Sequence, residues 1–192
     1  MNDVEETMTK ERSIIMNTAM VQAILDGRKT QTRRVVKFPK DYKWHEKEGF
    51  GSVGDDIKCP YEIGMKLWVR ETWQKVDNEI FYKAGFEHSE GVKWKPSIHM
   101  PRWASIILLE ITDIHVERLQ DISEEDAKKE GIGNTDTITV SEHTTKTYKQ
   151  AFGIYWRNVH VGRWKNKKHK GDSCWDKNPL VWVIEFKGVE VI

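Results

Sequence analysis

The possible folds of this chain are limited above all by one junction, at which a helix pattern stops at a glycine and passes directly into a basic, strand-like segment. Asn17 or Thr18 can cap a helix that runs to Asp26. Its apolar residues recur at helical spacing: Ala19, Met20, Ala23 and Ile24. Gly27 is placed to end this helix in the left-handed conformation that glycine tolerates. Residues 28–36 then begin in a tight turn and continue as a strand, so the turn carries the positive charge.

Short strand patterns account for most of the remaining structure. Strands are expected at 13–16, 67–73, 79–84, 103–116 and 180–192, the last with a bend at Gly188. Helices are expected at 124–130, after Ser123 and before Gly131, and at 146–158, with Tyr148, Phe152 and Tyr155 or Trp156 facing inward. Mostly antiparallel strands with two or three helices predict an α+β fold built on a small, partly closed β-barrel.

The chain length and composition suit one domain with one core. It has 192 residues, of which 38% are hydrophobic. Residues 1–12 are expected to be a flexible N-terminus, and 13–192 a single domain with insertions at about 37–63 and 134–178. The longest apolar runs are too short to span a membrane, and the charged N-terminus does not resemble a secretory signal. Two cysteines do not form a disulfide framework, so a reduced, cytoplasmic protein is expected.

Positive charge is concentrated in two blocks, although the formal net charge is only +1. Residues 28–43 hold seven Lys or Arg against one acid, and residues 157–170 hold six and no acid. Nine tryptophans are present, and four lie beside the basic blocks: Trp44, Trp156, Trp164 and Trp175. Aromatic rings interleaved with cations favour a single-stranded nucleic acid surface, through base stacking and phosphate contact. For the second block alone, a solvated surface loop explains the charge better.

Several catalytic and metal-binding motifs are absent from the sequence. There is no Gly-rich phosphate loop. His88-Ser89-Glu90 matches half of the zinc deaminase signature, but the Pro-Cys-x-x-Cys half is missing. The residues that could bind zinc have no ligand pair at zinc-site spacing: Cys59, Cys174, His160 and His169. We therefore expect no metal and no cofactor.

Three segments together resemble the ASCH domain family, a branch of the PUA-like barrels. The segment 27–34, Gly-Arg-Lys-Thr-Gln-Thr-Arg-Arg, looks like the basic signature of that family, in its order of helix, motif and strand. Residues 119–130 resemble the short acidic helix of the family, and residues 181–186 its closing strand. The stretch 68–73, Trp-Val-Arg-Glu-Thr-Trp, and the insertions are similar to a larger, phage-encoded ASCH-type group, which would place the protein in a host cytoplasm.

The resemblance also implies a catalytic trio. Small bacterial ASCH-type acetylcytidine amidohydrolases use a Lys and a Thr from the basic motif and a Glu from the acidic helix. The matching residues here are Lys29, Thr32 and Glu130. In that interpretation Lys29 is the general base, Thr32 the nucleophile and Glu130 the acid that protonates the leaving amine. The three side chains are expected to converge on one pocket at the mouth of the barrel.

Two further functions remain open from the sequence. One is a non-catalytic module that binds RNA or another nucleic acid, and the other is a ribonuclease that uses the same pocket. The extended basic blocks favour a polymer over a free nucleoside, because a nucleoside has no phosphate. Residues expected to contact a nucleic acid are Arg28, Arg33, Arg34, Arg70, Arg102, Trp164, Lys165, Lys167 and Lys168. Among them, Arg33, Arg34 or Arg70 could also hold a developing oxyanion. The sequence does not determine the oligomeric state.

Overall fold

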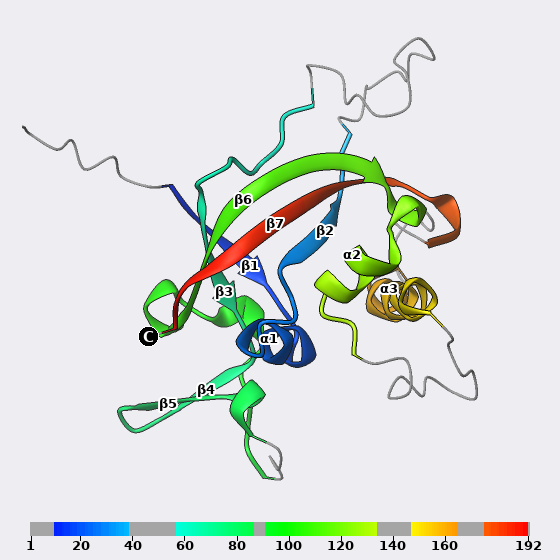
Figure 1. The fold of residues 1–192 in the computed structure, drawn as a ribbon. Coiled ribbons are helices and arrows are strands. Elements are labelled where there is room, and N and C mark those ends of the chain that lie inside the picture. The colour runs from blue at the N-terminus through cyan, green and yellow to red at the C-terminus, as the bar shows by residue number, and fades with distance from the viewer. Residues whose placement is uncertain (1–9, 39–56, 87–90, 134–146, 165–174, 192) are drawn as a thin grey trace, which may run out of the picture.

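The chain folds as a curved sheet with helices along one side (Figure 1). The computed structural model describes residues 10–38, 57–86, 91–133, 147–164 and 175–191. The helices are α1 (Thr18–Leu25), α2 (Glu124–Lys129) and α3 (Tyr148–Trp164). The strands are β1 (Glu11–Ile15), β2 (Gln31–Val35), β3 (Lys66–Arg70), β4 (Trp73–Val76), β5 (Glu79–Tyr82), β6 (Ile107–Arg118) and β7 (Leu180–Val191). The predicted α+β class is confirmed.

Five strands form the main sheet in the order β1-β3-β6-β7-β2, and β4 and β5 form a separate hairpin. Strand β1 runs parallel to β3, while the other neighbours in the sheet are antiparallel. The long strands β6 and β7 arch over the molecule, and their pairing register shifts twice, once opposite Gly188 (Figure 1). Among the described strands, β1 and β2 remain the two edges of the sheet, so the expected barrel is not closed.

Helix α3 belongs to the core, although it lies within the segment 134–178 that was expected to be an insertion. Phe152 and Trp156 are buried against the same cluster that contains Leu109 of β6 and Val183 of β7. Burial of two aromatic side chains removes a large apolar area from water, which fixes the helix to the sheet. Trp156 is therefore a core residue, as the helical periodicity predicts, and is not part of a nucleic acid surface.

Several element boundaries differ from the predictions. Strand β1 begins at Glu11, within the segment 1–12 that was expected to be a flexible N-terminus. The strand expected at 67–73 ends at Arg70, and Trp73 begins β4. The strand expected from residue 103 begins at Ile107, because Arg102–Ala104 form a 3-10 turn. Helix α3 continues to Trp164, so the first part of the expected basic loop is helical.

Other expectations fall outside the part of the chain that the structure describes. These include the N-terminal nine residues, Trp44, and the lysines expected to bind nucleic acid at 165, 167 and 168. Trp164 ends α3, and the structure describes its backbone only. None of the described helices is both long and apolar enough to span a bilayer.

Candidate functional site

The basic motif is held by backbone hydrogen bonds between α1 and α2. Helix α1 begins at the Asn17 cap, whose side chain accepts from the Met20 amide, and is followed by Gly27 at a φ of 70°. The amides of Arg28 and Lys29 both donate to the Ala23 carbonyl, at 2.8 and 2.9 Å. These bonds turn the chain sharply, so that the motif leaves α1 and enters β2 within a few residues.

Residues 29 and 30 also pair with the end of α2. Lys29 and Glu130 form an antiparallel β-bridge, and the Thr30 amide donates to the Lys129 carbonyl at 2.9 Å. Gly131 follows with a φ of 83°, and a Cβ there would lie 2.7 Å from Ala23 Cβ and 2.8 Å from Lys29 Cβ. Only glycine fits this position, because a methyl group would push α2 away from the motif.

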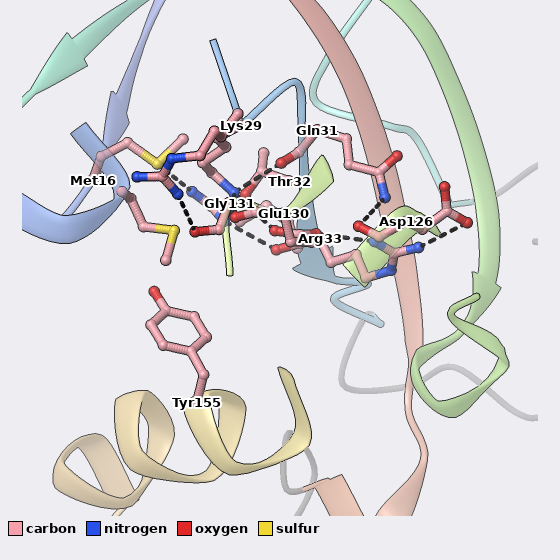
Figure 2. Close-up of polar contacts among 12 residues, drawn as sticks. Met16, Lys29, Gln31, Thr32, Arg33, Asp126, Glu130, Gly131 and Tyr155 are labelled. Carbon is pink, nitrogen blue, oxygen red and sulfur yellow. Dashed lines mark hydrogen bonds and ion pairs between the residues drawn. The ribbon is translucent and has the colours of Figure 1, made fainter. Parts of the chain in front are cut away.

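Lys29 and Glu130 form a buried ion pair (Figure 2). Lys29 is 3% exposed and Glu130 is 4% exposed. The Lys29 Nζ donates to Glu130 Oε2, to the Glu130 carbonyl and to the Gln31 carbonyl, each at 2.8 Å. Burial lowers the pKa of Lys29, and the charge and hydrogen bond of Glu130 oppose that shift. The predicted convergence of Lys29 and Glu130 is therefore present as direct contact.

Arg33 lies on the same side of the motif and completes a network of buried charges. Its Nε donates to Glu117 Oε1 at 2.6 Å, and its Nη1 donates to Glu130 Oε1 at 3.1 Å. Its Nη2 lies 3.8 Å from Asp126 Oδ2, and its guanidinium lies 5.8 Å from the centre of the Phe152 ring. The Arg33 side chain is 0% exposed, so it cannot meet a phosphate from solvent as the sequence suggested. It holds Glu130 in place instead.

Thr32 belongs to a second group, centred on Arg34. Arg34 Nη1 donates to the Thr32 hydroxyl oxygen at 2.6 Å, and Arg34 Nη2 reaches the Ile15 carbonyl at 3.4 Å and Met16 Sδ at 3.9 Å. Thr32 is buried, and its hydroxyl proton remains available to a further acceptor because Arg34 uses only a lone pair. Among the described contacts, the Thr32 hydroxyl is bonded to Arg34 and not to Lys29.

Tyr155 of α3 faces these groups from the opposite side (Figure 2). Its hydroxyl accepts a hydrogen bond from Asn17 Nδ2 at 3.1 Å. Burial raises the pKa of Tyr155, the Asn17 bond opposes the shift, and the negative charge of Glu130 adds to it. Tyr155 therefore adds a group from α3, late in the chain, to the surroundings of the site (Figure 2).

The other arginines that were expected to bind nucleic acid have protein partners. Arg28 pairs with Asp26 at 2.8 Å and donates to the Gly131 carbonyl. Arg102 pairs with Glu11 at 2.7 Å. Arg70 donates to the Ile98 carbonyl and lies over the ring of Trp68. Arg28, Arg70 and Arg102 are at least partly exposed, so a role for them in binding a polyanion stays a prediction.

Sequence reasoning missed several residues of the site. Glu117 and Asp126 supply carboxylates to Arg33, and Gln31 Nε2 donates to the Asp126 carbonyl at 3.1 Å. The alternation of Gln31 and Arg33 along β2 was a usable signal, because both side chains had to point to the same face. Helical spacing predicted that Tyr155 or Trp156 faces inward, but nothing in the sequence connected Tyr155 with the site, and Glu117 gave no local signal. In the described part of the chain, no cluster of three or more His, Cys, Asp or Glu side chains is arranged to hold a metal.

The comparisons with known proteins found similarity only to solved structures. No protein family and no curated protein match the chain by sequence. The structure of an ASCH domain from Lactobacillus crispatus JV V101 aligns with a TM-score of 0.47 at 14% identity, over 94% of this chain and 80% of the other. A protein of Enterococcus faecalis V583, described as DUF984, aligns with a TM-score of 0.43 at 11% identity, over 88% of this chain and 66% of the other.

Proposed function

We propose that this chain is a hydrolase that removes the acetyl group from the exocyclic amine of an acetylated cytidine. Lys29 is the general base, Thr32 the nucleophile and Glu130 the general acid. The observation that carries the proposal is the buried contact of 2.8 Å between Lys29 Nζ and Glu130 Oε2. In a buried pair that shares one proton, the base can accept a proton and the acid can donate one, so that the net charge of the pair stays the same.

The pair can exist as an ammonium and a carboxylate or, after transfer of one proton, as an amine and a carboxylic acid. Burial disfavours the charged form of Lys29 and thereby lowers its pKa, which increases the population of the neutral amine. The neutral form of the pair is the one that catalysis needs. The Lys29 amine then accepts a proton, while the Glu130 carboxylic acid donates one.

In the first half-reaction the hydroxyl proton of Thr32 passes to Lys29 through a bridging water or a rotation of the Lys29 amine, since the two groups are not in contact in this structure. The Thr32 oxygen then attacks the acetyl carbonyl carbon. The bond from that carbon to the exocyclic nitrogen breaks, and Glu130 protonates the nitrogen as cytidine leaves. In the second half-reaction water attacks the acetyl ester of Thr32 and gives a proton to the Glu130 carboxylate. Lys29 returns its proton to the Thr32 oxygen, so acetic acid leaves and both groups recover their starting states.

Arg34 is suited to stabilise the charge that develops in this reaction. Its Nη1 already lies 2.6 Å from the Thr32 oxygen, the atom that becomes more negative as its proton leaves. A fixed cation beside that atom lowers the energy of the transition state more than that of the ground state. Arg33 acts through Glu130, which it orients with a bond of 3.1 Å.

The test is a set of paired substitutions at the three proposed catalytic residues. Thr32→Val removes the hydroxyl with little change of shape, and Thr32→Ser keeps it. We expect Lys29→Met, Glu130→Gln and Thr32→Val to lower turnover of N4-acetylcytidine by about a hundred- to ten-thousand-fold, while Thr32→Ser keeps measurable activity. Turnover is measured from the change in ultraviolet absorbance as the acetyl group leaves.

Because Lys29 and Glu130 are buried, each substitution also costs stability, and unfolding must be measured beside turnover. Loss of one partner of a buried pair costs about 3–5 kcal/mol, so assays are run where circular dichroism shows the variant to be folded. Equal turnover in Thr32→Val and wild type would contradict the nucleophile assignment. Absence of turnover in the wild type, on both the nucleoside and acetylated RNA, would contradict the hydrolase.

A non-catalytic nucleic-acid-binding module is the second candidate. The observation in its favour is that all three Lys29 Nζ donors have acceptors, which is the geometry of a structural ion pair. A ribonuclease in the same pocket is separated from both by incubating the wild type with unmodified RNA and following chain length on a gel. Binding without cleavage or deacetylation identifies the binding module.

A further inference from the structure

We propose that the β4–β5 hairpin and the neighbouring 3-10 turns form a binding surface for single-stranded RNA, with Trp103 as a base-stacking platform. This platform surface is defined by five residues: Trp73, Lys75, Lys95, Trp103 and Arg70. The inference deepens the proposed function, on which it rests for the modified base, because it makes the substrate a strand and not a free nucleoside.

Trp103 packs edge-on against one buried tryptophan, yet most of its surface is in solvent. It is 63% exposed, whereas the neighbouring Trp73 is 4% exposed and packs with Met100 and Ala104. The two rings meet at 90° with their centres 5.9 Å apart. The perpendicular contact anchors the Trp103 indole without covering it. An exposed indole is suited to stack on a base, since every base offers an aromatic face.

Two lysines lie over the tryptophan rings of this surface. Lys75 Nζ lies 5.7 Å from the centre of the Trp103 ring, and Lys95 Nζ lies 5.0 Å from the centre of the Trp73 ring. Neither lysine forms an ion pair with an acid among the described residues, and the hairpin's own acids, Asp77 and Glu79, lie at its turn. Ammonium groups without a carboxylate partner are free to neutralise phosphates on either side of a stacked base.

A line of contacts connects the platform surface to the candidate active site. Arg34, which binds Thr32, also reaches the Ile15 carbonyl, and Ile15 pairs in register with Arg70. Arg70 in turn donates to the carbonyl of Ile98, in the 3-10 turn Ser97–His99 that precedes the turn containing Trp103. These contacts link the platform surface to the candidate active site through the paired strands β1 and β3.

A protein partner is the competing occupant, because Ile98 beside the platform is 56% exposed. The cations favour a polyanion over an apolar protein face. An apolar partner would have to cover Lys75 and Lys95 without giving them carboxylates, and burying unpaired ammonium groups is costly. A nucleic acid supplies an aromatic base that can stack on Trp103. It also supplies the negative charge that this surface lacks.

The test measures binding of a fluorescein-labelled, unmodified ten-nucleotide RNA by anisotropy across a range of salt concentrations. We expect Trp103→Ala to weaken binding by about 5- to 150-fold, the effect of losing one stacked base, while Trp103→Phe keeps most of the affinity. The double variant Lys75→Ala with Lys95→Ala should reduce the salt slope by about 0.7 for each phosphate that the lysines no longer neutralise. Lys187→Ala in β7, an exposed lysine paired with Glu110, is the matched control and should leave both quantities unchanged.

Three further arms separate the alternatives. Binding of inorganic polyphosphate should depend on the two lysines but not on Trp103, and single-stranded DNA of the same sequence shows whether the sugar matters. Unchanged RNA affinity in Trp103→Ala overturns the proposal, as does a change of oligomeric state in Trp103→Ala during sedimentation, which would make the surface an interface between copies. Turnover of free N4-acetylcytidine is measured separately, on the wild type. If no turnover is found at all, the hydrolase fails while the binding result still stands or falls by itself.

Discussion

At the scale of single residues, Glu71 has the least favourable environment among the described carboxylates. It lies where the strand expected at 67–73 is interrupted, it is 2% exposed, and its Oε2 has no hydrogen-bond partner in the structure. Burial raises the pKa of Glu71 from 4.5 to about 7. The charge of Glu71 in turn contributes to the raised pKa of nearby Tyr82, after the larger effect of burial.

This environment predicts a pH dependence of stability. Because the folded-state pKa of Glu71 lies above its unfolded value, the folded state binds more protons between pH 4.5 and about 7. The free energy of unfolding should therefore fall as the pH rises through that window. Glu71→Gln removes the charge and should match wild type near pH 4.5 but exceed it at pH 8, by on the order of 3 kcal/mol.

Urea denaturation at the two pH values measures this difference. Glu79→Gln, an exposed carboxylate in the adjacent β4–β5 hairpin, is the control and should change stability by the same small amount at both pH values. A Glu71→Gln effect that is equal at pH 4.5 and pH 8 would show that the Glu71 carboxyl titrates normally in the folded protein.

At the scale of secondary-structure elements, the end of α2 determines whether the site can assemble. The helix begins at the Ser123 cap, whose hydroxyl accepts from the Asp126 amide, and it leads through Glu130 into Gly131. Its short length means that it gains little from its own hydrogen bonds. The position of α2 depends on close packing of Gly131 against Lys29 and Ala23, which the absence of a side chain at Gly131 allows.

Gly131→Ala should therefore disturb both stability and the active site. The new Cβ would lie within 2.8 Å of Ala23 and Lys29 side-chain atoms at a φ of 83°, so we expect a loss of about 2–4 kcal/mol and a fall in turnover. Gly64→Ala is a matched control, because Gly64 has a φ of 81° and nothing within 4 Å of its Cβ position. Gly64→Ala should lose about 1 kcal/mol of stability, because alanine is strained in a left-handed backbone conformation, and it should keep full turnover.

Thermal unfolding monitored by circular dichroism, with a deacetylation assay on the folded fraction, measures both effects. An equal loss of unfolding free energy in Gly131→Ala and Gly64→Ala would mean that α2 can move away from the motif without destabilising the protein. In that case the close packing around Gly131 would not be what holds Glu130 against Lys29.

At the scale of the whole molecule, α3 joins a late part of the chain to the sheet and to the site. Phe152 and Trp156 enter the core, while Tyr155 of the same helix faces the Lys29–Glu130 pair. The three residues are spaced i, i+3 and i+4, so one face of the helix packs against both the apolar core and the polar site. A segment with this arrangement folds together with the domain and not as an added module.

Phe152→Ala should consequently lower the stability of the entire domain, by about 3–5 kcal/mol, with a single unfolding transition. Phe152 is 1% exposed, whereas Val159 in the same helix is 42% exposed. Val159→Ala is the control and should cost about 0.5 kcal/mol or less. Guanidinium denaturation followed by both fluorescence and circular dichroism checks the result. Separate transitions for the two signals would show that α3 unfolds independently of the sheet.

Much of the local structure was determined by the sequence alone, because it depends on neighbours within a few residues. The caps at Asn17 and Ser123, the stops at Gly27 and Gly131, and the strand patterns of β2, β6 and β7 were all predicted, and the structure confirms them. Together they predicted the α+β class. The pairing of Lys29 with Glu130 came from resemblance to a known family, since no local pattern relates residues so far apart.

Tertiary contacts decided what the local patterns could not. Helix α3 lies in a segment expected to be an insertion, yet its aromatic residues bury against the sheet and make it part of the core. The basic motif resembled an exposed cationic surface, yet Arg33 is buried among carboxylates of β6 and α2. In the sequence Arg33 is surrounded by other cations, and its acidic partners lie more than eighty residues away. Its charge is neutralised only when the fold brings those carboxylates within hydrogen-bond distance, because the attraction between charges falls off with separation and is screened by water until both are buried.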